Sequence, residues 1–317
     1  MIPVLDTTKS PAESGQQVQI VHRSIPAACD RLLRVTNSPP PWDRVHHFHD
    51  GSPRTVQYLF ILDSLNFCFW PPPKWHVTFG GKALGGYYSL STALKLAVES
   101  DPNWLDAAFL ADVSLAAVDK ALTGNRSIPL LEARWRILHE VGQVLLDTYQ
   151  GQATNLVAAA QGSAPKLVGL LVRDFPNFRD EATYHDRPVA FYKRAQIFVA
   201  DLHGAFEGRQ WGAFHDLERL TTFADYQVPR VLRALGVLRY SAELADRVDR
   251  RKLIDQGSEA EVEIRACTVW AVELLIRELA SRGHSLTAVE LDWILWNLSK
   301  DPAYQAQPHH RTLTTFY

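Results

Sequence analysis

Apolar residues run almost unbroken from position 60 to position 70, and two strongly polar residues, Asp63 and Asn66, interrupt them. An unpartnered carboxylate or amide is costly to bury, so such groups are normally hydrogen-bonded or used in function. The wider segment 55–69 fits either a helix or a buried strand, and its length favours a helix. A spacing of three would then place Asp63 and Asn66 on one helix face. The alternative to a functional pair is a polar clamp inside the core.

The pattern along the rest of the chain predicts a mostly helical protein. A β-hairpin over residues 75–84, with Gly80-Gly81 at its turn, is the one clear strand signal. We expect the polar residues 1–17 to form a flexible lead and residues 18–317 to form a single domain. The predicted fold is therefore mainly α, a compact single helical domain with a small β-hairpin. Predicted helices cover residues 28–36, 89–99, 103–110, 114–123, 129–149, 165–174, 189–206, 213–222, 229–238, 259–281 and 287–298.

Composition narrows the classes of function. The 317 residues carry a net charge of −2, so no global positive field attracts nucleic acid. No apolar run approaches the ~20 residues that a membrane span needs, and residues 1–19 lack the apolar core of a signal peptide. The three cysteines, Cys29, Cys68 and Cys267, match neither a disulfide framework nor a metal-binding spacing. These features predict a cytoplasmic protein with no membrane partner and no direct nucleic-acid partner.

Asp225 is the strongest catalytic candidate among the acidic residues. It lies between two predicted helices, and Pro229 fits the first turn of the second one. Asp225 therefore precedes a helix N-terminus, where negative charge is favoured. The alternative is that Asp225 is an ordinary N-terminal turn residue.

Two charged pairs on predicted helices are further candidates. Lys193 and Arg194 are adjacent, and successive helical residues point about 100° apart, so one of them can face inward. An inward lysine is a plausible phosphate ligand, whereas an outward one is simply solvated. Glu261 and Arg265 are four residues apart and can pair. This pair is either a routine surface salt bridge or part of a helix that is soon heavily buried.

Asp292 is a lone carboxylate within an apolar helix, and it shares a face with Trp296. A carboxylate beside indole rings suits the donor edge of a guanine-like base, although a surface position on an amphipathic helix is equally open. The cluster of His46, His47 and His49 does not match a metal-binding spacing, and no cysteine lies near it. We therefore predict no metal site.

Several stretches of the chain also resemble one known family. In order they are Phe60-Ile61-Leu62-Asp63-Ser64-Leu65-Asn66-Phe67-Cys68-Phe69-Trp70, Gly85-Gly86-Tyr87-Tyr88-Ser89-Leu90, Phe191-Tyr192-Lys193-Arg194-Ala195-Gln196, Leu220-Thr221-Thr222-Phe223-Ala224-Asp225-Tyr226-Gln227-Val228-Pro229 and Glu261-Val262-Glu263-Ile264-Arg265. Together they resemble the queuosine salvage protein family, the queuosine 5'-phosphate N-glycosylase/hydrolases. The resemblance extends roughly from residue 40 to residue 298. A single block is weak evidence, but five blocks in family order are strong evidence.

This resemblance implies an enzyme. The implied reaction hydrolyses the N-glycosidic bond of queuosine 5'-monophosphate, which releases queuine and ribose 5-phosphate for queuine salvage into tRNA. We expect a monomer that acts on this small nucleotide without a cofactor, in a fold reminiscent of helical DNA glycosylases. The 7-deazaguanine base has carbon in place of N7, so protonation at N7 cannot activate the leaving group. The enzyme must then rely on stabilising the ribosyl oxocarbenium ion and on donors to other base atoms.

The resemblance also assigns roles to particular residues. Asp225 matches the acidic catalyst, and His46 matches a histidine that could act as general acid or base. Lys193 is implied to bind the phosphate, with help from Tyr88 or Arg265. The other expected substrate-binding residues are Asn66, Asp292 as a reader of base donors, and Phe67, Tyr226 and Trp296 as stacking partners for the base. The chain departs from the family pattern at Arg230, where we expect glutamine.

Two other classes of function stay open from the sequence alone. A helical nucleic-acid glycosylase would act on flipped bases and would need a basic face and salt-sensitive binding to polynucleotide. A non-catalytic helical binding module would need an exposed apolar face. It would also leave the acids Asp63, Asp225 and Asp292 without a role.

Overall fold

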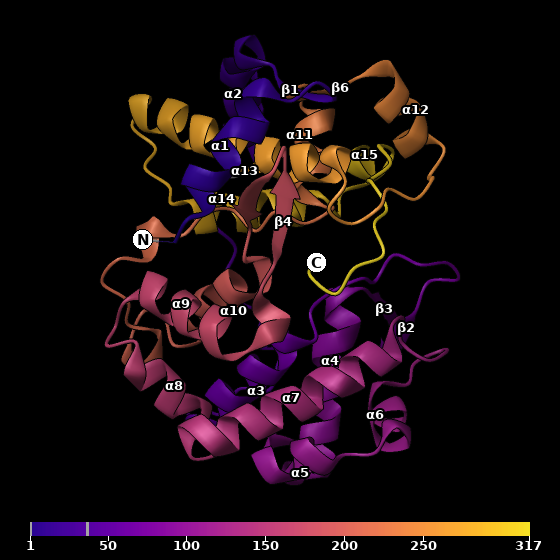
Figure 1. Cartoon of the computed structure of the whole chain (residues 1–317), viewed down its shortest axis with the longest axis vertical. Coiled ribbons are helices and arrows are strands. Elements are labelled where there is room, and N and C mark those ends of the chain that lie inside the picture. Colours follow the sequence, from indigo (N-terminus) through magenta and orange to yellow (C-terminus); the bar gives the residue numbers. More distant parts are fainter. Residues whose placement is uncertain (1, 36–37) are drawn as a thin grey trace.

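The computed structural model describes residues 2–35 and 38–317, and helices dominate them as predicted (Figure 1). The helices are α1 (Val4–Ser14), α2 (Ile25–Val35), α3 (Pro53–Ser64), α4 (Tyr87–Ser100), α5 (Ala107–Asp112), α6 (Leu115–Leu122), α7 (Leu131–Tyr149), α8 (Ala153–Ala159), α9 (Ala164–Asp174), α10 (Lys193–Ala205), α11 (Val228–Ala234), α12 (Ala242–Asp249), α13 (Glu259–Ser281), α14 (Ala288–Leu298) and α15 (Pro302–Gln305). The strands are β1 (Val18–Ile20), β2 (His76–Phe79), β3 (Lys82–Gly85), β4 (Glu181–Tyr184), β5 (Arg187–Ala190) and β6 (Leu238–Tyr240).

The helices form two groups that share one long helix. Figure 1 shows α3 to α9 at one end of the molecule and α1, α2 and α11 to α15 at the other, with α10 and β4 between them. Two hydrophobic clusters follow this division, one built mainly from α3 to α10 and the other from α2 and α11 to α14. Helix α13 contributes buried residues to both clusters, so it joins the two groups.

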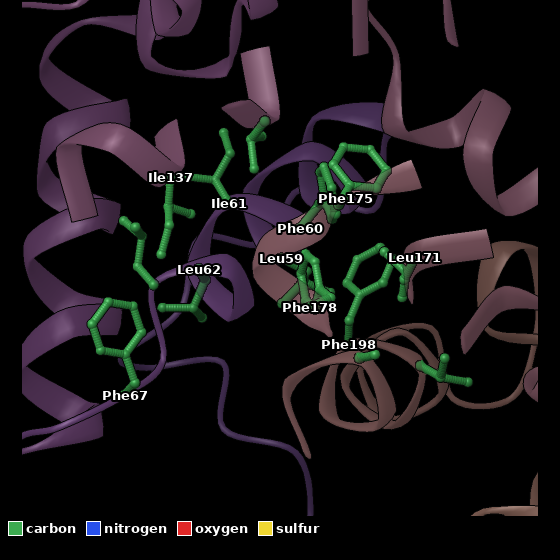
Figure 2. Packing of buried hydrophobic residues seen from close by; sticks show 14 of the residues in the cluster. Leu59, Phe60, Ile61, Leu62, Phe67, Ile137, Leu171, Phe175, Phe178 and Phe198 are labelled. Carbon is green, nitrogen blue, oxygen red and sulfur yellow. The ribbon is translucent and has the colours of Figure 1, made fainter. Parts of the chain in front are cut away.

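Helix α3 occupies the centre of the larger cluster. The Phe60 ring meets the rings of Phe175, Phe198 and Phe178 at centroid distances of 5.0, 5.3 and 5.9 Å, and Figure 2 shows these rings converging from separate elements. Complete burial of one such ring contributes about 1.5–3 kcal/mol. The apolar run that stands out in the sequence therefore builds the main core.

Three antiparallel sheets of two strands each accompany the helices. The hairpin predicted at 75–84 is confirmed as β2 and β3, with Val77 opposite Leu84. The prediction of a single strand signal was wrong, because β4 pairs with β5 and β1 pairs with β6. The β1–β6 ladder joins Val18 to Tyr240. Segments so far apart in sequence give no local hairpin signature.

The expected flexible lead contains a helix. Helix α1 lies along α13, and Gly15 follows it. The segment after α1 is held by Glu263, whose carboxylate accepts hydrogen bonds from the backbone nitrogens of Gln17 at 2.7 Å and Val18 at 2.9 Å. A side chain at Gly15 would lie 2.6 Å from the Glu263 carboxylate, so only glycine fits there. That residues 18–317 form one domain stays a prediction.

The helix predicted over 55–69 ends at Ser64. The Arg194 guanidinium donates to the Ser64 carbonyl, and the Arg134 guanidinium donates to two later carbonyls, including that of Phe67. These buried cations take the carbonyl groups that a continuing helix would need for its own hydrogen bonds. Asp63 and Asn66 therefore do not share a helix face.

The helix predicted over 213–222 is also absent, since this segment holds only one 3-10 turn, Leu217–Arg219. Asp216 accepts a hydrogen bond from the backbone of Ala164 at the start of α9, and the Thr221 backbone nitrogen donates to Gln196. Long-range contacts thus replace the local helical pattern.

Other helix boundaries shift where strands intervene. The helix predicted from 189 begins at Lys193 because β5 precedes it, and the helix predicted to 238 ends at Ala234 because β6 follows. The sequence pattern does not predict α8 or α12.

The hydrogen bonds between the N-terminal segment and Glu263 give a test of stability. Replacing Glu263 with alanine removes the acceptor for Gln16, Gln17, Val18 and the Tyr184 hydroxyl. We expect the free energy of unfolding to fall by about 3–5 kcal/mol, because buried donors lose their partner. Urea denaturation measures the change.

The matched control is Glu259→Ala in the first turn of the same helix, where the side chain is exposed. This control should change stability by less than about 1 kcal/mol. Equal losses of stability in the two variants would contradict this role of Glu263.

Candidate active site

A cavity of about 540 Å³ opens between the two groups of helices. Helices α10 and α14, the start of α4 and several loop segments supply its walls. Many of the lining side chains are aromatic, and four aspartates and three cations line the cavity with them. The aromatic residues are Trp42, Phe69, Tyr87, Tyr88, Phe223, Tyr226, Trp293, Trp296 and Tyr317, and the charged residues are Asp43, Arg44, Lys193, Asp201, Asp225, Asp292 and Lys300.

Asp225 lies in the turn before α11, as predicted from Pro229. Its Oδ1 accepts hydrogen bonds from the backbone nitrogens of Gln227 at 2.7 Å and Val228 at 2.9 Å. Both bonds end on Oδ1, so the carboxyl group is fixed while Oδ2 takes no part in them. Burial raises the pKa of Asp225, and the nearby Lys193 ammonium opposes that rise.

Asp292 projects from α14 and is held in the same manner. Its Oδ1 accepts from the Thr222 hydroxyl and from the Phe223 backbone nitrogen. Burial, together with the nearby Asp225 carboxylate, raises the pKa of Asp292 to about 7. The predicted surface alternative for Asp292 is excluded, since its side chain is buried and lines the cavity.

Lys193 is the first residue of α10, and its side chain is buried. Its Nζ donates to the Asn66 carbonyl at 3.0 Å. Burial lowers the pKa of Lys193 to about 8, while Asp225 is the strongest of the carboxylates that oppose this shift. The predicted inward lysine is therefore confirmed. Arg194 is also buried, which the two-face argument did not predict.

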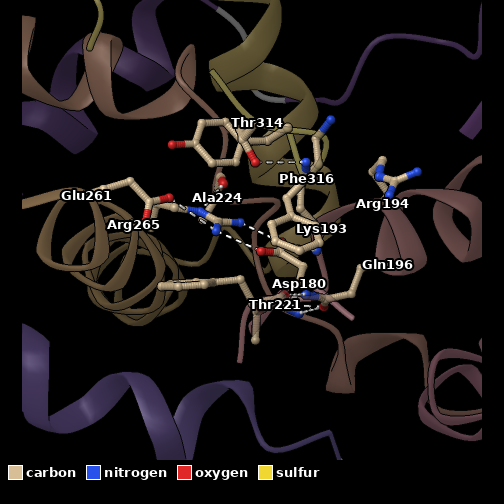
Figure 3. A network of polar contacts seen from close by, with 12 residues as sticks. Asp180, Lys193, Arg194, Gln196, Thr221, Ala224, Glu261, Arg265, Thr314 and Phe316 are labelled. Carbon is tan, nitrogen blue, oxygen red and sulfur yellow. Dashed lines mark hydrogen bonds and ion pairs between the residues drawn. The ribbon is translucent and has the colours of Figure 1, made fainter. Parts of the chain in front are cut away.

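Arg265 holds the two segments that carry Asp225 and Lys193. Its guanidinium pairs with Asp180 at 2.6 Å, and its Nε donates to the carbonyl of Ala224, the residue before Asp225. Asp180 in turn accepts from the Lys193 backbone nitrogen at 3.1 Å. Figure 3 shows Arg265 between Glu261 and Asp180, and all three side chains are buried. Arg265 does not line the cavity, and the surface salt-bridge alternative for it is excluded.

The structure places most of the expected site residues at the cavity and leaves three of them outside its lining, namely Arg265, Phe67 and His46. Asn66, Tyr88, Tyr226 and Trp296 line the cavity, and the rings of Tyr88 and Trp296 lie 5.6 Å apart. Phe67 lies outside the lining, beneath the Arg134 guanidinium, whose Cζ is 4.0 Å from the ring centroid. His46 also lies outside the lining, and its Nδ1 is 2.6 Å from Asp43.

Sequence reasoning missed Asp201, which lies two turns after Lys193 on α10 and also lines the cavity. Its Oδ1 accepts a hydrogen bond from Trp42 Nε1 at 3.2 Å, and its Oδ2 lies 3.0 Å from the Tyr87 hydroxyl oxygen. Burial raises the pKa of Asp201 to about 6. The signal that could have found it is its eight-residue spacing from Lys193 on one helix, which places both residues on nearly the same face.

Asp63 lies near the cavity but does not line it. Both of its carboxyl oxygens are buried. Burial raises the pKa of Asp63 well above its ordinary value, and the neighbouring Asp201 raises it further. The raised pKa favours the neutral form of the Asp63 side chain in the folded protein.

The described residues form neither a cluster of metal ligands nor a membrane-spanning helix. Within residues 2–35 and 38–317, no group of three or more His, Cys, Asp or Glu side chains is arranged to hold a metal ion. No helix in the same residues is both long and apolar enough to cross a membrane.

Comparison with known proteins identifies relatives along nearly the whole chain. A family model described as queuosine salvage protein matches residues 46–317. A protein of Sphaerobacter thermophilus is 45% identical over 314 residues, which cover 99% of this chain and 97% of the relative. A Mus musculus protein is 35% identical over 327 residues, which cover 96% of each chain. A Dictyostelium discoideum protein is 40% identical over 264 residues, or 83% of this chain and 78% of the relative. All three relatives are named queuosine 5'-phosphate N-glycosylase/hydrolase.

The raised pKa of Asp63 predicts how stability depends on pH. A raised pKa in the folded state gives a contribution that is complete below the unfolded pKa of about 4 and is lost as pH rises toward the folded pKa. The variant Asp63→Asn cannot ionise. Over that interval we expect it to gain up to about 1.4 kcal/mol per pH unit relative to the wild type.

Chemical denaturation of both proteins at pH 5, 6, 7 and 8 measures this difference. A stability difference that stays constant across the series would mean that Asp63 is ionised in the folded protein.

Proposed function

The chain belongs to the queuosine salvage protein family, and on that basis we propose that it hydrolyses the N-glycosidic bond of queuosine 5'-monophosphate, releasing queuine and ribose 5-phosphate. The observation that carries the proposal is the buried group of Asp225, Asp292 and Lys193 in one aromatic cavity. Two fixed carboxyl groups beside a cation are what a glycosidic cleavage needs.

The size and lining of the cavity suit a nucleotide with a flat base. Its volume of about 540 Å³ lies within the ~300–1,000 Å³ typical of small-molecule sites. Tyr88, Trp296 and Tyr226 offer ring surfaces on which a base can stack. Asn66 adds polar atoms near Lys193, and so contributes to orienting the ligand.

Asp225 is the proposed catalytic carboxylate. Its Oδ1 is anchored by two backbone nitrogens, so the group is already oriented before substrate binds. A preorganised carboxylate in a water-poor cavity stabilises positive charge at the anomeric carbon as the bond to the base breaks. Lys193 supports this role because it favours the ionised form of Asp225. The same carboxylate can act as a nucleophile or as an electrostatic partner for attacking water.

Asp292 is the proposed partner of the base. The leaving group lacks N7, so another donor must stabilise the charge that develops on the base. With a pKa of about 7, the Asp292 carboxyl is protonated in a large fraction of molecules at neutral pH and can donate a hydrogen bond or a proton. An ionised Asp292 would instead accept from the base, as the sequence-based prediction has it.

Three cationic side chains line the cavity and are candidates to bind the phosphate of the substrate. The expected contact between Lys193 and the phosphate stays a prediction, and Arg44 and Lys300 also line the cavity. Three carboxyl groups, those of Asp225, Asp63 and Asp292, act on Lys193. The Lys300 ammonium lies 3.7 Å from the centroid of the Trp296 ring, and Asp225 also acts on it.

We also propose that the protein acts as a cytoplasmic monomer on free nucleotide. The three free, buried cysteines are in keeping with a reducing compartment. The net charge of −2 disfavours a polynucleotide substrate. Phe67, Arg265 and His46 are not assigned a direct contact with substrate.

The variant Asp225→Asn tests the catalytic carboxylate. Asparagine preserves the shape and keeps an oxygen for the two backbone nitrogens, but it cannot carry negative charge. We expect turnover of queuosine 5'-monophosphate to fall at least about 100-fold while the protein remains folded. Chromatography of released queuine measures the rate.

A matched control is Asp249→Asn on α12, which changes a half-exposed carboxylate paired with Arg233 far from the cavity lining. It should retain full turnover. Release of queuine by Asp225→Asn at the wild-type rate would remove Asp225 from the mechanism and leave the activity in place. No release by folded wild type would overturn the proposed function itself.

The state of Asp292 predicts a pH profile. If the protonated group assists departure of the base, kcat/KM falls as pH rises through about 7, approaching a tenfold loss per pH unit. Initial rates from pH 5.5 to 8.5 test this. A rate that instead rises through pH 7 would identify the ionised carboxylate as the active form.

A further inference from the structure

A continuous chain of hydrogen bonds runs along one wall of the cavity. His47 Nδ1 lies 2.6 Å from the Asp43 carbonyl oxygen, and His47 Nε2 lies 2.8 Å from the Tyr87 hydroxyl. The same hydroxyl lies 3.0 Å from Asp201 Oδ2. Asp201 Oδ1 accepts from Trp42 Nε1 at 3.2 Å, and all five residues line the cavity.

The positions of the protons along this chain of hydrogen bonds follow from its donor and acceptor atoms. A backbone carbonyl only accepts, so His47 must carry hydrogen on Nδ1. Neutral His47 then accepts at Nε2, and the single hydroxyl hydrogen of Tyr87 must go there. The Tyr87 oxygen has no hydrogen left for Asp201, although the two oxygens are within hydrogen-bond distance. Asp201 must therefore supply the hydrogen, which requires a protonated carboxyl group.

The other arrangements are unfavourable. If Tyr87 donated to an ionised Asp201, the lone pairs of His47 Nε2 and of the Tyr87 oxygen would face each other across 2.8 Å. Moving the His47 hydrogen to Nε2 would aim a nitrogen lone pair at the Asp43 carbonyl oxygen across 2.6 Å. A doubly protonated imidazole would satisfy every contact, but burial lowers the pKa of His47 to about 4. Loss of the Tyr87 proton is also disfavoured, since burial and the nearby Asp201 raise the pKa of that hydroxyl well above its ordinary value.

Burial also favours a neutral Asp201. Asp63 on α3 and Asp201 are both buried, and each influences the ionisation of the other. Burial raises the pKa of Asp201 to about 6, whereas the hydrogen bonds to Tyr87 and Trp42, and then the Lys193 ammonium, lower it, so the protonated state rests on the geometry of the hydrogen bonds. The titratable groups that act on the chain are Asp63, Tyr58 and Lys193 around Asp201, and Asp43, His46 and Lys95 around His47.

The backbone beneath Trp42 is shaped for this contact. Gly204 lies on α10 one turn after Asp201, and a side chain there would come within 2.9 Å of the Trp42 ring. The missing side chain lets the indole lie on the helix with its nitrogen directed at Asp201. The same ring forms part of the cavity wall.

We infer that Asp201 is protonated in the working enzyme and acts as a positioning residue for substrate binding. Its neutral carboxyl group donates to Tyr87 and accepts from Trp42, and so it fixes two aromatic rings of the cavity wall. His47 completes the chain by orienting the Tyr87 hydroxyl. The role in substrate binding rests on the proposed function, whereas the proton on Asp201 does not.

The proton is tested without substrate by nitrogen NMR of protein labelled with ¹⁵N-histidine. We expect the His47 ring to be neutral, with hydrogen on Nδ1 and an accepting Nε2 at pH 7. The variant His47→Gln assigns its signals among the 12 histidines. A doubly protonated ring, or hydrogen on Nε2 alone, would overturn the inference whatever the activity.

Steady-state kinetics on queuosine 5'-monophosphate test the positioning role. The amide of Asp201→Asn can donate to Tyr87 and accept from Trp42, so it reproduces the neutral acid, and we expect KM within about twofold of the wild type. Tyr87→Phe and Asp201→Ala break the chain, and we expect each to raise KM about tenfold with a smaller change in kcat. The matched control is Tyr304→Phe on α15, which takes no part in these hydrogen bonds. It should leave both KM and kcat unchanged.

The outcomes separate this inference from the proposed function. Equal losses of binding by Asp201→Asn and Asp201→Ala would show that the ionised carboxylate is required, which overturns the inference and leaves the reaction intact. If kcat falls in Tyr87→Phe and Asp201→Ala while KM stays unchanged, that result would also contradict a positioning role. If the wild-type protein has no hydrolase activity, the kinetic experiment gives no answer. The NMR signals of His47 would still decide whether Asp201 carries the proton.

Discussion

The buried ion pair between Arg265 and Asp180 is the interaction on which the rest of the site depends. Burying two charges is costly, and the cost is offset only when hydrogen bonds and geometry are nearly complete. Here both oxygens of Asp180 meet the guanidinium at 2.6 and 2.8 Å, and the rings of Phe191 and Tyr317 lie 3.9 and 4.4 Å from its central carbon. Because the same pair also holds the backbone beside Asp225 and at Lys193, these two cavity-lining side chains share one anchor.

The desolvation that makes this ion pair costly also raises the pKa values of the carboxyl groups around the cavity. Four carboxyl groups, those of Asp63, Asp201, Asp225 and Asp292, lie close to a single buried lysine, and burial raises the pKa of each of them. In water all four would be ionised and nearly equivalent. In the protein their different hydrogen bonds separate them, so that identical side chains can hold different charges at the same pH.

The sequence predicts those parts of the structure that local pattern controls. The hairpin of β2 and β3, the long helices α7 and α13, and the place of Asp225 before α11 all follow from nearby glycines, prolines and apolar spacing. The inward direction of Lys193 and the lining positions of Tyr88 and Trp296 were also predictable, although they came from a family resemblance as much as from pattern.

Long-range contacts account for what the sequence does not show. The end of α3 depends on Arg194, whose guanidinium reaches a carbonyl 130 residues away, and the structured N-terminal segment depends on Glu263. Arg265 has a nearby partner in Glu261 at 3.4 Å, but its closer pairing is with Asp180, 85 residues earlier. Asp201 stayed hidden because its partners, Trp42 and Tyr87, come from segments more than a hundred residues before it.

The docking of α1 and β1 onto α13 and β6 has a consequence for how the chain is made. The first helix leaves the ribosome more than 200 residues ahead of the surface that covers it, and the cavity wall formed by α14 follows even later. The cavity therefore gains this wall only after α14 has been synthesised. A nascent or truncated chain that stops before α14 lacks Asp292 and Trp296, and so it cannot enclose the cavity that the folded protein forms.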